Sequence, residues 1–130
     1  MLINHQPKIL VIDDSKENIE LISQILYSPD EPYKIITAHN GYEAIKKVDE
    51  FIPDLIILDV VMPGINGFEV CKKLKANPRT RLIPIVMITA LGSQKDRIKG
   101  LEVGVDDFIS KPFNIYELIA RVKNLRSFMT

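Results

Sequence analysis

The sequence predicts an open α/β fold in which a five-stranded parallel sheet carries helices on both faces. Five short runs rich in Ile, Val and Leu recur along the chain, and a stretch with helical periodicity follows each one. Several runs lack the alternation of apolar and polar residues that a half-exposed strand shows, as strands buried on both faces do. Strands and helices that alternate through short connections form parallel sheets with right-handed crossovers.

The first two strand–helix units begin with the runs KILVID (8–13) and YKIITAH (33–39), which are the predicted strands. Ser15 occupies the N-cap position before the first helix, and Asn40 with Glu43 fits an Asn form of the capping box before the second. The apolar stripes of the two helices, at three- and four-residue spacing, consist of Ile19, Ile22, Ile25 and Leu26, and of Ala44, Ile45, Val48 and Phe51.

The last three units follow the same plan. Ser93 is a cap residue for the fourth helix, Gly104 is a stop signal after it, and Asn114 with Glu117 fits a second capping box. The predicted strands are DLIILDV (54–60), PIVMITA (84–90) and DDFISK (106–111). The apolar stripe of the third helix is Phe68, Cys71 and Leu74, that of the fourth is a weaker pair of Ile98 and Leu101, and that of the fifth is Leu118, Val122 and Leu125.

Length and composition predict a single domain. With 130 residues, 46% of them apolar, the chain can build one substantial core, and we expect residues 1–130 to form one domain with its core at about 8–126. The final helical pattern passes Phe128 and Met129 without a Gly or Pro stop. This pattern fits a helix that continues into a linker or an output domain outside this chain, and it fits a frayed terminus equally well.

The charge balance and the cysteine count exclude several classes of protein. Seventeen basic residues match seventeen acidic ones, which argues against direct binding to nucleic acid or to a membrane surface. The single cysteine, Cys71, cannot form an internal disulfide, and its place in a helical stripe favours a small buried hydrophobe. No stretch resembles a signal peptide or a membrane span. A cytoplasmic location is therefore expected.

Polar side chains lie at the carboxyl ends of several predicted strands. In a parallel sheet these ends share one edge, which is the usual place for a ligand in this architecture. They are Asp13 and Asp14, Asp59, Thr89 and Lys111. Three adjacent carboxylates repel one another unless a cation lies among them, and ligands that are all oxygen favour Mg²⁺. Lys111 and Thr89 suit an anion such as a phosphoryl group. Asp59, at the tip of a central strand, could attack phosphorus to form an acyl phosphate.

These residues carry a resemblance to a known family. The acidic pair at 13–14, Asp59 followed by MPG at 62–64 and by Gly67, TA at 89–90 and KPF at 111–113 resemble the receiver domains of two-component response regulators, the CheY-like family. The resemblance extends from about Lys8 to Arg126, and it implies the flavodoxin-like (βα)5 fold with strand order 2-1-3-4-5. The stretches 59–75 and 96–113 look most like receivers fused to larger signalling proteins such as diguanylate cyclases.

The resemblance also implies roles at the predicted site. Asp59 resembles the phosphoacceptor and a Mg²⁺ ligand. Asp14 resembles a direct ligand of that ion, Asp13 a ligand that acts largely through water, and the Val61 carbonyl a backbone ligand. Lys111 would pair with the phosphoryl oxygens. The protein would be a signalling phosphoacceptor and not an enzyme with a separate substrate, since it would catalyse only its own phosphorylation and slow dephosphorylation.

A conformational switch follows from the same resemblance. Thr89 resembles the hydroxyl that moves toward the phosphoryl group, Ala90 leaves room for the movement, and Phe108 resembles the aromatic residue that turns inward with it. Spacing alone favours an ordinary core aromatic at Phe108. The bond between Lys111 and Pro112 resembles the family's cis peptide. A histidine kinase or phosphotransfer protein would be the donor, and the face made by the fourth helix, fifth strand and fifth helix would contact an output domain, a partner protein or a second copy in a homodimer.

Two apolar positions suggest a long-lived phosphoryl state. Val61 and Leu91, which lie two residues after Asp59 and Thr89, are apolar where versions of the resembled family are polar, and neither side chain can orient an attacking water. Other functions remain as alternatives: a protein-binding module that is never phosphorylated, and an aspartate-nucleophile phosphatase, whose D-x-D pattern would need an acid at Val61. A nucleotide-binding motor or GTPase would need a G-x-x-x-x-G-K-[ST] loop, and a flavin-binding module a Ser/Thr/Gly-rich loop where DDSKEN stands.

Overall fold

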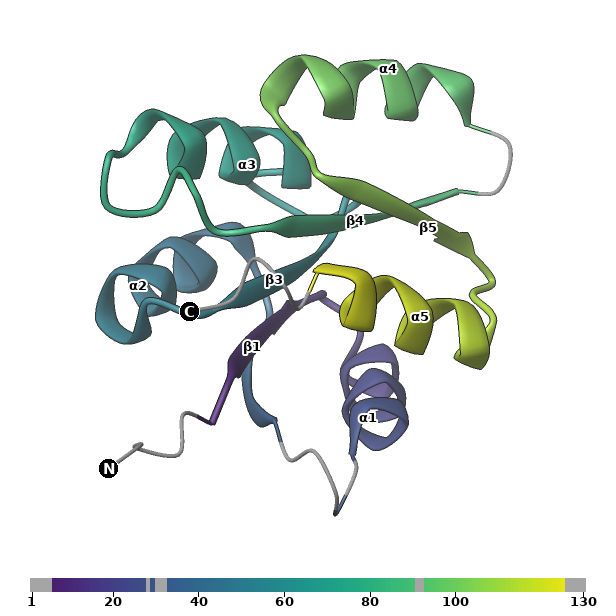
Figure 1. The fold of residues 1–130 in the computed structure, drawn as a ribbon. Helices are drawn as coiled ribbons and strands as arrows, with labels where there is room; N and C mark the ends of the chain where they lie inside the picture. Colours follow the sequence, from purple (N-terminus) through teal and green to yellow (C-terminus); the bar gives the residue numbers. More distant parts are fainter. Residues whose placement is uncertain (1–5, 28, 30–32, 91–92, 126–130) are drawn as a thin grey trace.

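The computed structural model describes residues 6–27, 29, 33–90 and 93–125. Strands and helices alternate strictly along this part of the chain (Figure 1). The predicted strand ends differ from the observed ones by at most one residue. The elements are β1 (Lys8–Ile12), α1 (Lys16–Leu26), β2 (Lys34–Ala38), α2 (Gly41–Phe51), β3 (Leu55–Asp59), α3 (Gly67–Ala76), β4 (Ile85–Ala90), α4 (Gln94–Val103), β5 (Asp107–Lys111) and α5 (Ile115–Leu125).

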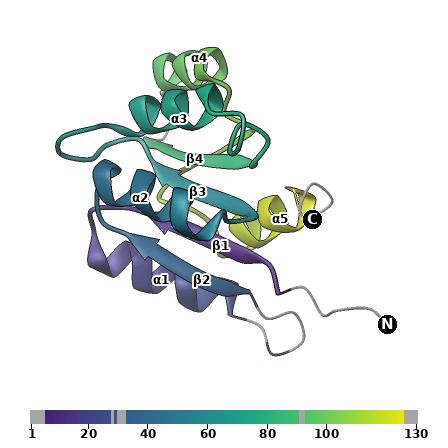
Figure 2. The same ribbon diagram turned by 90° about the vertical axis from the view of Figure 1, so that its left-hand side faces the viewer.

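One parallel sheet organises the described residues, in the order β2-β1-β3-β4-β5. The fold class, the strand order and the helices on both faces are confirmed. Helices α1 and α5 cover one face, and α2, α3 and α4 cover the other (Figure 2). Chain order reverses between β1 and β3, so the polar loops after these two strands meet at the middle of the carboxyl edge.

The core has two layers, one on each side of the sheet. All five residues of β3 are buried, which explains why its sequence LIILD lacks alternation. On one side the layer includes Ile22 of α1 and Leu118 of α5, and on the other it includes Val48 of α2 and Leu74 of α3. The strand that ends in Asp59 is therefore held from both faces, which limits the movement of the carboxylate at its tip.

Side chains cap the helices largely as predicted. The Ser15, Asn40 and Ser93 side chains each accept a hydrogen bond from a backbone N–H in the first turn of the helix that follows. At the second helix the predicted box is incomplete, because the Glu43 carboxylate accepts from the His39 N–H at 2.7 Å instead of returning to Asn40.

The helix caps of α3 and α5 differ in completeness. Both bonds of a capping box are present at Asn66 and Glu69, a pair that the sequence analysis did not single out. The Asn114 side chain accepts from the Glu117 N–H at 3.2 Å, which is one half of the box predicted there. The start of α3, directly after the site loop, is thus fixed by two reciprocal bonds.

The interpretation of α4 needs a correction. The helix is present, but Ile98 and Leu101 do not form its buried stripe, since their side chains are 56% and 65% exposed. The residue that faces the protein is Gly100, which is buried. Two apolar residues three positions apart define a helical face only weakly, and here tertiary packing favours the side without a side chain.

Cys71 is fully buried in α3, as its place in the helical stripe predicted. Its thiol donates to the Val103 carbonyl oxygen at 3.4 Å, and burial raises the pKa of the thiol to about 11. The residue therefore acts as a packing residue. The predictions for Leu91, Arg126, Phe128 and Met129 fall outside the described residues.

Candidate functional site

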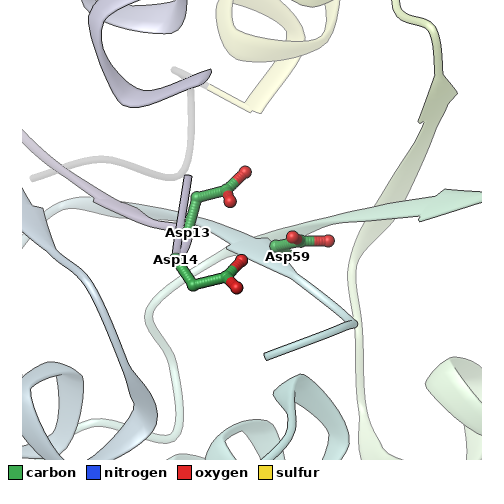
Figure 3. Close-up of side chains that lie close together, drawn as sticks. All are labelled: Asp13, Asp14 and Asp59. Carbon is green, nitrogen blue, oxygen red and sulfur yellow. The ribbon is translucent and has the colours of Figure 1, made fainter. Parts of the chain in front are cut away.

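Three carboxylates meet at the carboxyl edge of the sheet. Asp59 is the last residue of β3, and Asp13 and Asp14 directly follow the neighbouring strand β1 (Figure 3). One oxygen from each carboxylate lies within 4.8 Å of the other two. Asp13 and Asp59 are almost completely buried, at 1% and 2% exposure, whereas Asp14 is exposed. The predicted acidic cluster is thus assembled, with an open side toward solvent at Asp14.

Two hydrogen bonds, one from the loop after β1 and one from the first turn of α1, hold Asp13 in place. One of its carboxylate oxygens accepts from the Ser15 N–H at 2.9 Å, and the other accepts from the Asn18 side-chain amide at 3.2 Å. Ser15 also caps α1. The same short loop therefore starts the helix and orients a carboxylate. Sequence analysis identified Ser15 only as a cap and did not identify Asn18, since contacts between side chains of a loop and a helix have no periodic signal.

Lys111 reaches the cluster from the end of β5. Its Nζ lies 3.0 Å from Asp59 Oδ2, although β4 separates the two strands in the sheet. The side chain is only partly exposed, so the charge-assisted bond is better shielded than a surface pair. The peptide bond between Lys111 and Pro112 is cis. The ammonium group neutralises one of the three carboxylates and leaves an excess of negative charge.

The electrostatics of Asp59 reflect this crowding. The pKa of its carboxyl group is raised from 3.8 to about 6, chiefly by burial; the hydrogen bond from Lys111 opposes this increase, and the negative charge of Asp13 adds to it. A second cation would stabilise the ionised form. The donors are all hard oxygen ligands, and Mg²⁺ needs few of them because it retains several waters. The residues therefore fit a Mg²⁺ ion held by Asp13, Asp14 and Asp59.

Thr89 presents a buried hydroxyl with no observed partner. It lies near the end of β4, is 1% exposed, and its Oγ1 has no hydrogen-bond partner among the residues that the structure describes. An unsatisfied buried hydroxyl costs about 1 to 3 kcal/mol. Thr89 is followed by Ala90, which ends the strand. A hydroxyl in this state can form a new hydrogen bond without breaking an old one.

Phe108 is already buried in this structure, at 8% exposure. Its ring belongs to the core layer that contains Met87 and Val105. In this structure the ring thus takes the inward position that the resemblance associates with the switched state. The family resemblance identified Phe108, but sequence analysis did not identify the residues that surround the ring.

Gly67 allows the loop after Asp59 to turn back onto the strand. A Cβ atom at this position would lie 2.4 Å from the Asp59 carbonyl oxygen and 2.9 Å from Val60 Cα, which are backbone atoms that cannot move aside. The Gly67 N–H also donates to the Val60 carbonyl oxygen at 3.0 Å. The glycine therefore keeps the loop that carries Val61 close to the carboxylate cluster, and the Val61 side chain itself is exposed.

Comparisons with known proteins agree with this geometry. Residues 9–123 match the family model of the response regulator receiver domain. The response regulator PleD of Caulobacter vibrioides is 47% identical over 121 residues, which are 93% of this chain and 26% of PleD. The phosphate regulon transcriptional regulatory protein PhoB of Rhizobium meliloti is 41% identical over 90% of this chain and 51% of PhoB. The chain thus spans a quarter to a half of these curated relatives.

A solved structure supports the same fold. The chemotaxis response regulator CheY4 of Vibrio cholerae superimposes with a TM-score of 0.85 and 32% identity, over 93% of this chain and 99% of that one. Among the described residues, no helix has the length and apolar character needed to cross a membrane.

Proposed function

Since this chain belongs to the response regulator receiver domain family of two-component signalling, we propose that Asp59 accepts a phosphoryl group from the phosphohistidine of a histidine kinase or phosphotransfer protein. The observation that carries the proposal is the position of Asp59 and its surroundings. It is a buried carboxylate at the tip of the central strand, it contacts Lys111 at 3.0 Å, and two further carboxylates lie within 4.8 Å. We take residues 1–130 as one receiver domain.

The reaction is an in-line exchange at phosphorus. A carboxylate oxygen of Asp59 attacks, its bond to phosphorus forms, and the bond between phosphorus and the donor imidazole nitrogen breaks. The electron pair of the broken bond stays on the imidazole, which takes up a proton. The product is an acyl phosphate on Asp59, and attack of water on phosphorus later returns the carboxylate and releases inorganic phosphate.

Residues around Asp59 position the transferred group. Lys111 would move its hydrogen bond from the carboxylate to a phosphoryl oxygen, and the Thr89 hydroxyl, which has no observed partner, would donate to another. Asp13, Asp14, Asp59 and the Val61 carbonyl would hold Mg²⁺, which supplies positive charge that offsets the phosphoryl oxygens when it is bound. The chain thus needs no general base, because the nucleophile is already a carboxylate.

Output is proposed to follow from a population shift. Donation from Thr89 to the phosphoryl group, with Phe108 inside, would favour one arrangement of α4, β5 and α5. The outer surface of α4 carries the exposed Ile98 and Leu101, and on α5 Arg121 pairs with Asp107 of β5 at 3.3 Å. This surface is proposed to meet an output domain, a separate partner protein or a second copy of the chain in a homodimer.

The wider context is likewise proposed. The relatives are longer than this chain, which supports a role as the receiver part of a larger regulator. A cytoplasmic location is proposed from the single cysteine, Cys71, and the absence of direct nucleic-acid or membrane contacts by this domain is proposed from its balanced charge. Position 61 is an exposed valine, so the second acid of the D-x-D pattern of an aspartate-nucleophile phosphatase is missing here.

Intact mass spectrometry after incubation with acetyl phosphate tests the phosphoacceptor role. The wild type should gain the mass of one phosphoryl group with Mg²⁺ and not after chelation, and Asp59→Ala should gain none. Asp49→Ala, which removes an exposed carboxylate of α2, is the matched control and should behave as the wild type. A folded wild type that gains no mass from acetyl phosphate or from a phosphorylated kinase would favour a binding module that is never phosphorylated.

A further inference from the structure

The ring of Phe108 packs directly on the backbone of α4 at Gly100. A Cβ atom at Gly100 would lie 2.6 Å from Phe108 Cε1 and 2.8 Å from Cζ, well inside the contact distance of real side chains. The next nearest atom, Met87 Sδ, would be 3.5 Å away. With α4 at its present distance from the sheet, the ring therefore fits only because position 100 has no side chain.

Arg97 covers the same ring one turn earlier in the helix. Its Cζ lies 5.4 Å from the ring centroid, a distance typical of cation–π contacts. Its Nη2 donates to Ser110 Oγ of β5 at 3.2 Å. Ser110 is the register partner of Thr89 in β4. The guanidinium thus links α4 to the strand position beside the switch hydroxyl and holds the ring between them.

We propose that Arg97 and Gly100, together called the α4 clamp, are positioning residues that hold the Phe108 ring inside. The clamp lowers the free energy of the inward conformer relative to one with the ring outside. Its link to signalling rests on the proposed function: if a phosphoryl group at Asp59 favours the inward ring, then holding the ring inside must favour occupation of Asp59 at equilibrium by the same factor. The clamp would thus raise the equilibrium affinity of the site for a phosphoryl group.

Glycine at position 100 is expected to lower the intrinsic stability of α4, which makes the proposal testable. Gly100 lies inside α4, where Ala is intrinsically the better helix former. If Gly100 served no contact, Gly100→Ala would raise stability. The α4 clamp predicts that Gly100→Ala lowers stability when Phe108 is present. Once the colliding ring atoms are gone, as in Phe108→Leu, the same substitution should no longer lower stability.

The first experiment measures this double-mutant cycle by urea unfolding. Gly100→Ala should lower the midpoint in the wild-type background and leave it unchanged or raise it in the Phe108→Leu background. An equal decrease in both backgrounds would overturn the proposal, because the cost would then come from helix packing unrelated to the ring. Urea unfolding of the four proteins requires no phosphoryl donor, so the result does not depend on phosphorylation.

The second experiment reports the ring directly. Phenylalanine labelled with fluorine gives a ¹⁹F spectrum in which the resonance of Phe108 is assigned by its loss in Phe108→Leu. Without any phosphoryl donor, Gly100→Ala and Arg97→Gln should move this resonance toward the shift of the unfolded chain and increase its sensitivity to solvent, and Arg97→Lys should restore it partly. Lys99→Gln is the matched control, since Lys99 lies over Phe68 and not over Phe108. An unmoved resonance in both clamp variants would refute the clamp.

The third measurement tests the link to signalling. The equilibrium affinity for beryllofluoride, a non-covalent mimic of the phosphoryl group, should fall about tenfold in Gly100→Ala, a size typical of coupled equilibria, and should stay unchanged in Lys99→Gln. A displaced ring with an unchanged affinity would refute the coupling. A wild type that forms no adduct with acetyl phosphate would instead contradict the proposed function, while the unfolding and ¹⁹F results would still decide whether the clamp holds the ring.

Discussion

Replacing Asp59 with Asn is expected to make the fold more stable at neutral pH. Burial, joined by the charge of Asp13, raises the pKa of Asp59 to about 6 in the folded protein, against 3.8 for the ordinary carboxyl group. The folded state therefore holds this proton more tightly than the unfolded state does. The contribution of Asp59 to stability is fully present below about pH 4 and is lost as the pH rises through about 6. Asparagine keeps the shape of the protonated acid and does not titrate.

The magnitude follows from the two pKa values. They differ by about two pH units, and each unit corresponds to about 1.4 kcal/mol, so the ionised carboxylate costs the fold about 3 kcal/mol at pH values above both. The bond from Lys111 at 3.0 Å already contributes to the value of about 6, so it needs no separate correction. Asp59→Asn should be more stable than the wild type by about this amount at about pH 7.5, and by almost nothing at about pH 4.

Urea unfolding of both proteins across this pH range, in buffer with a chelator, measures the difference. Asp49→Asn serves as control, since its carboxylate is exposed and its pairing with Arg79 is worth little. Added Mg²⁺ should reduce the difference, because a cation among the carboxylates favours the ionised form of Asp59. A difference that stays constant with pH, or a less stable Asp59→Asn at about pH 7.5, would refute the electrostatic reasoning.

Four further outcomes are expected. Gly67→Ala should destabilise the fold by about 2 kcal/mol or more, because its Cβ would collide with backbone atoms of the preceding strand, and an unchanged urea midpoint would contradict that contact. Asn66→Ala should cost about 1 kcal/mol through loss of the capping box of α3, measured in the same way, with a value near zero counting against the cap. Asp14→Asn should weaken Mg²⁺ binding by about tenfold in calorimetry, a factor that corresponds to about 1.4 kcal/mol, whereas equal affinity would remove Asp14 from the ligand set. Val61→Asn should speed the loss of the phosphoryl group, followed by intact mass over time, since an amide at this exposed position can orient water; an unchanged decay would reject the idea of a long-lived state.

Sequence patterns predicted the sheet well because its central strands are buried on both faces. A run such as LIILD has no exposed side to interrupt it, and its observed end at Asp59 lies one residue before the predicted end at Val60. The acidic cluster was predictable for the same reason, since the topology of parallel strands brings Asp13 and Asp59 to one edge.

Other features depend on contacts that leave no local pattern. The apolar pair of α4 lies outside, because the packing of Phe108 requires the glycine side of that helix to face the sheet. The bond between Asn18 and Asp13 and the position of Arg97 over the ring likewise join residues from different elements. Such details depend on the distance between packed elements, which periodicity does not encode.

The central claim is that Asp59 itself carries the phosphoryl group. Borohydride reduces an acyl phosphate to an alcohol and so converts the modified aspartate to homoserine. Cleavage after Lys47 and Lys72 gives a peptide that contains Asp49, Asp54 and Asp59, and fragment masses distinguish these three positions. We expect homoserine at Asp59 alone, and only when acetyl phosphate and Mg²⁺ were both present. Homoserine at another aspartate, or a phosphoryl adduct that borohydride does not reduce, would contradict the account.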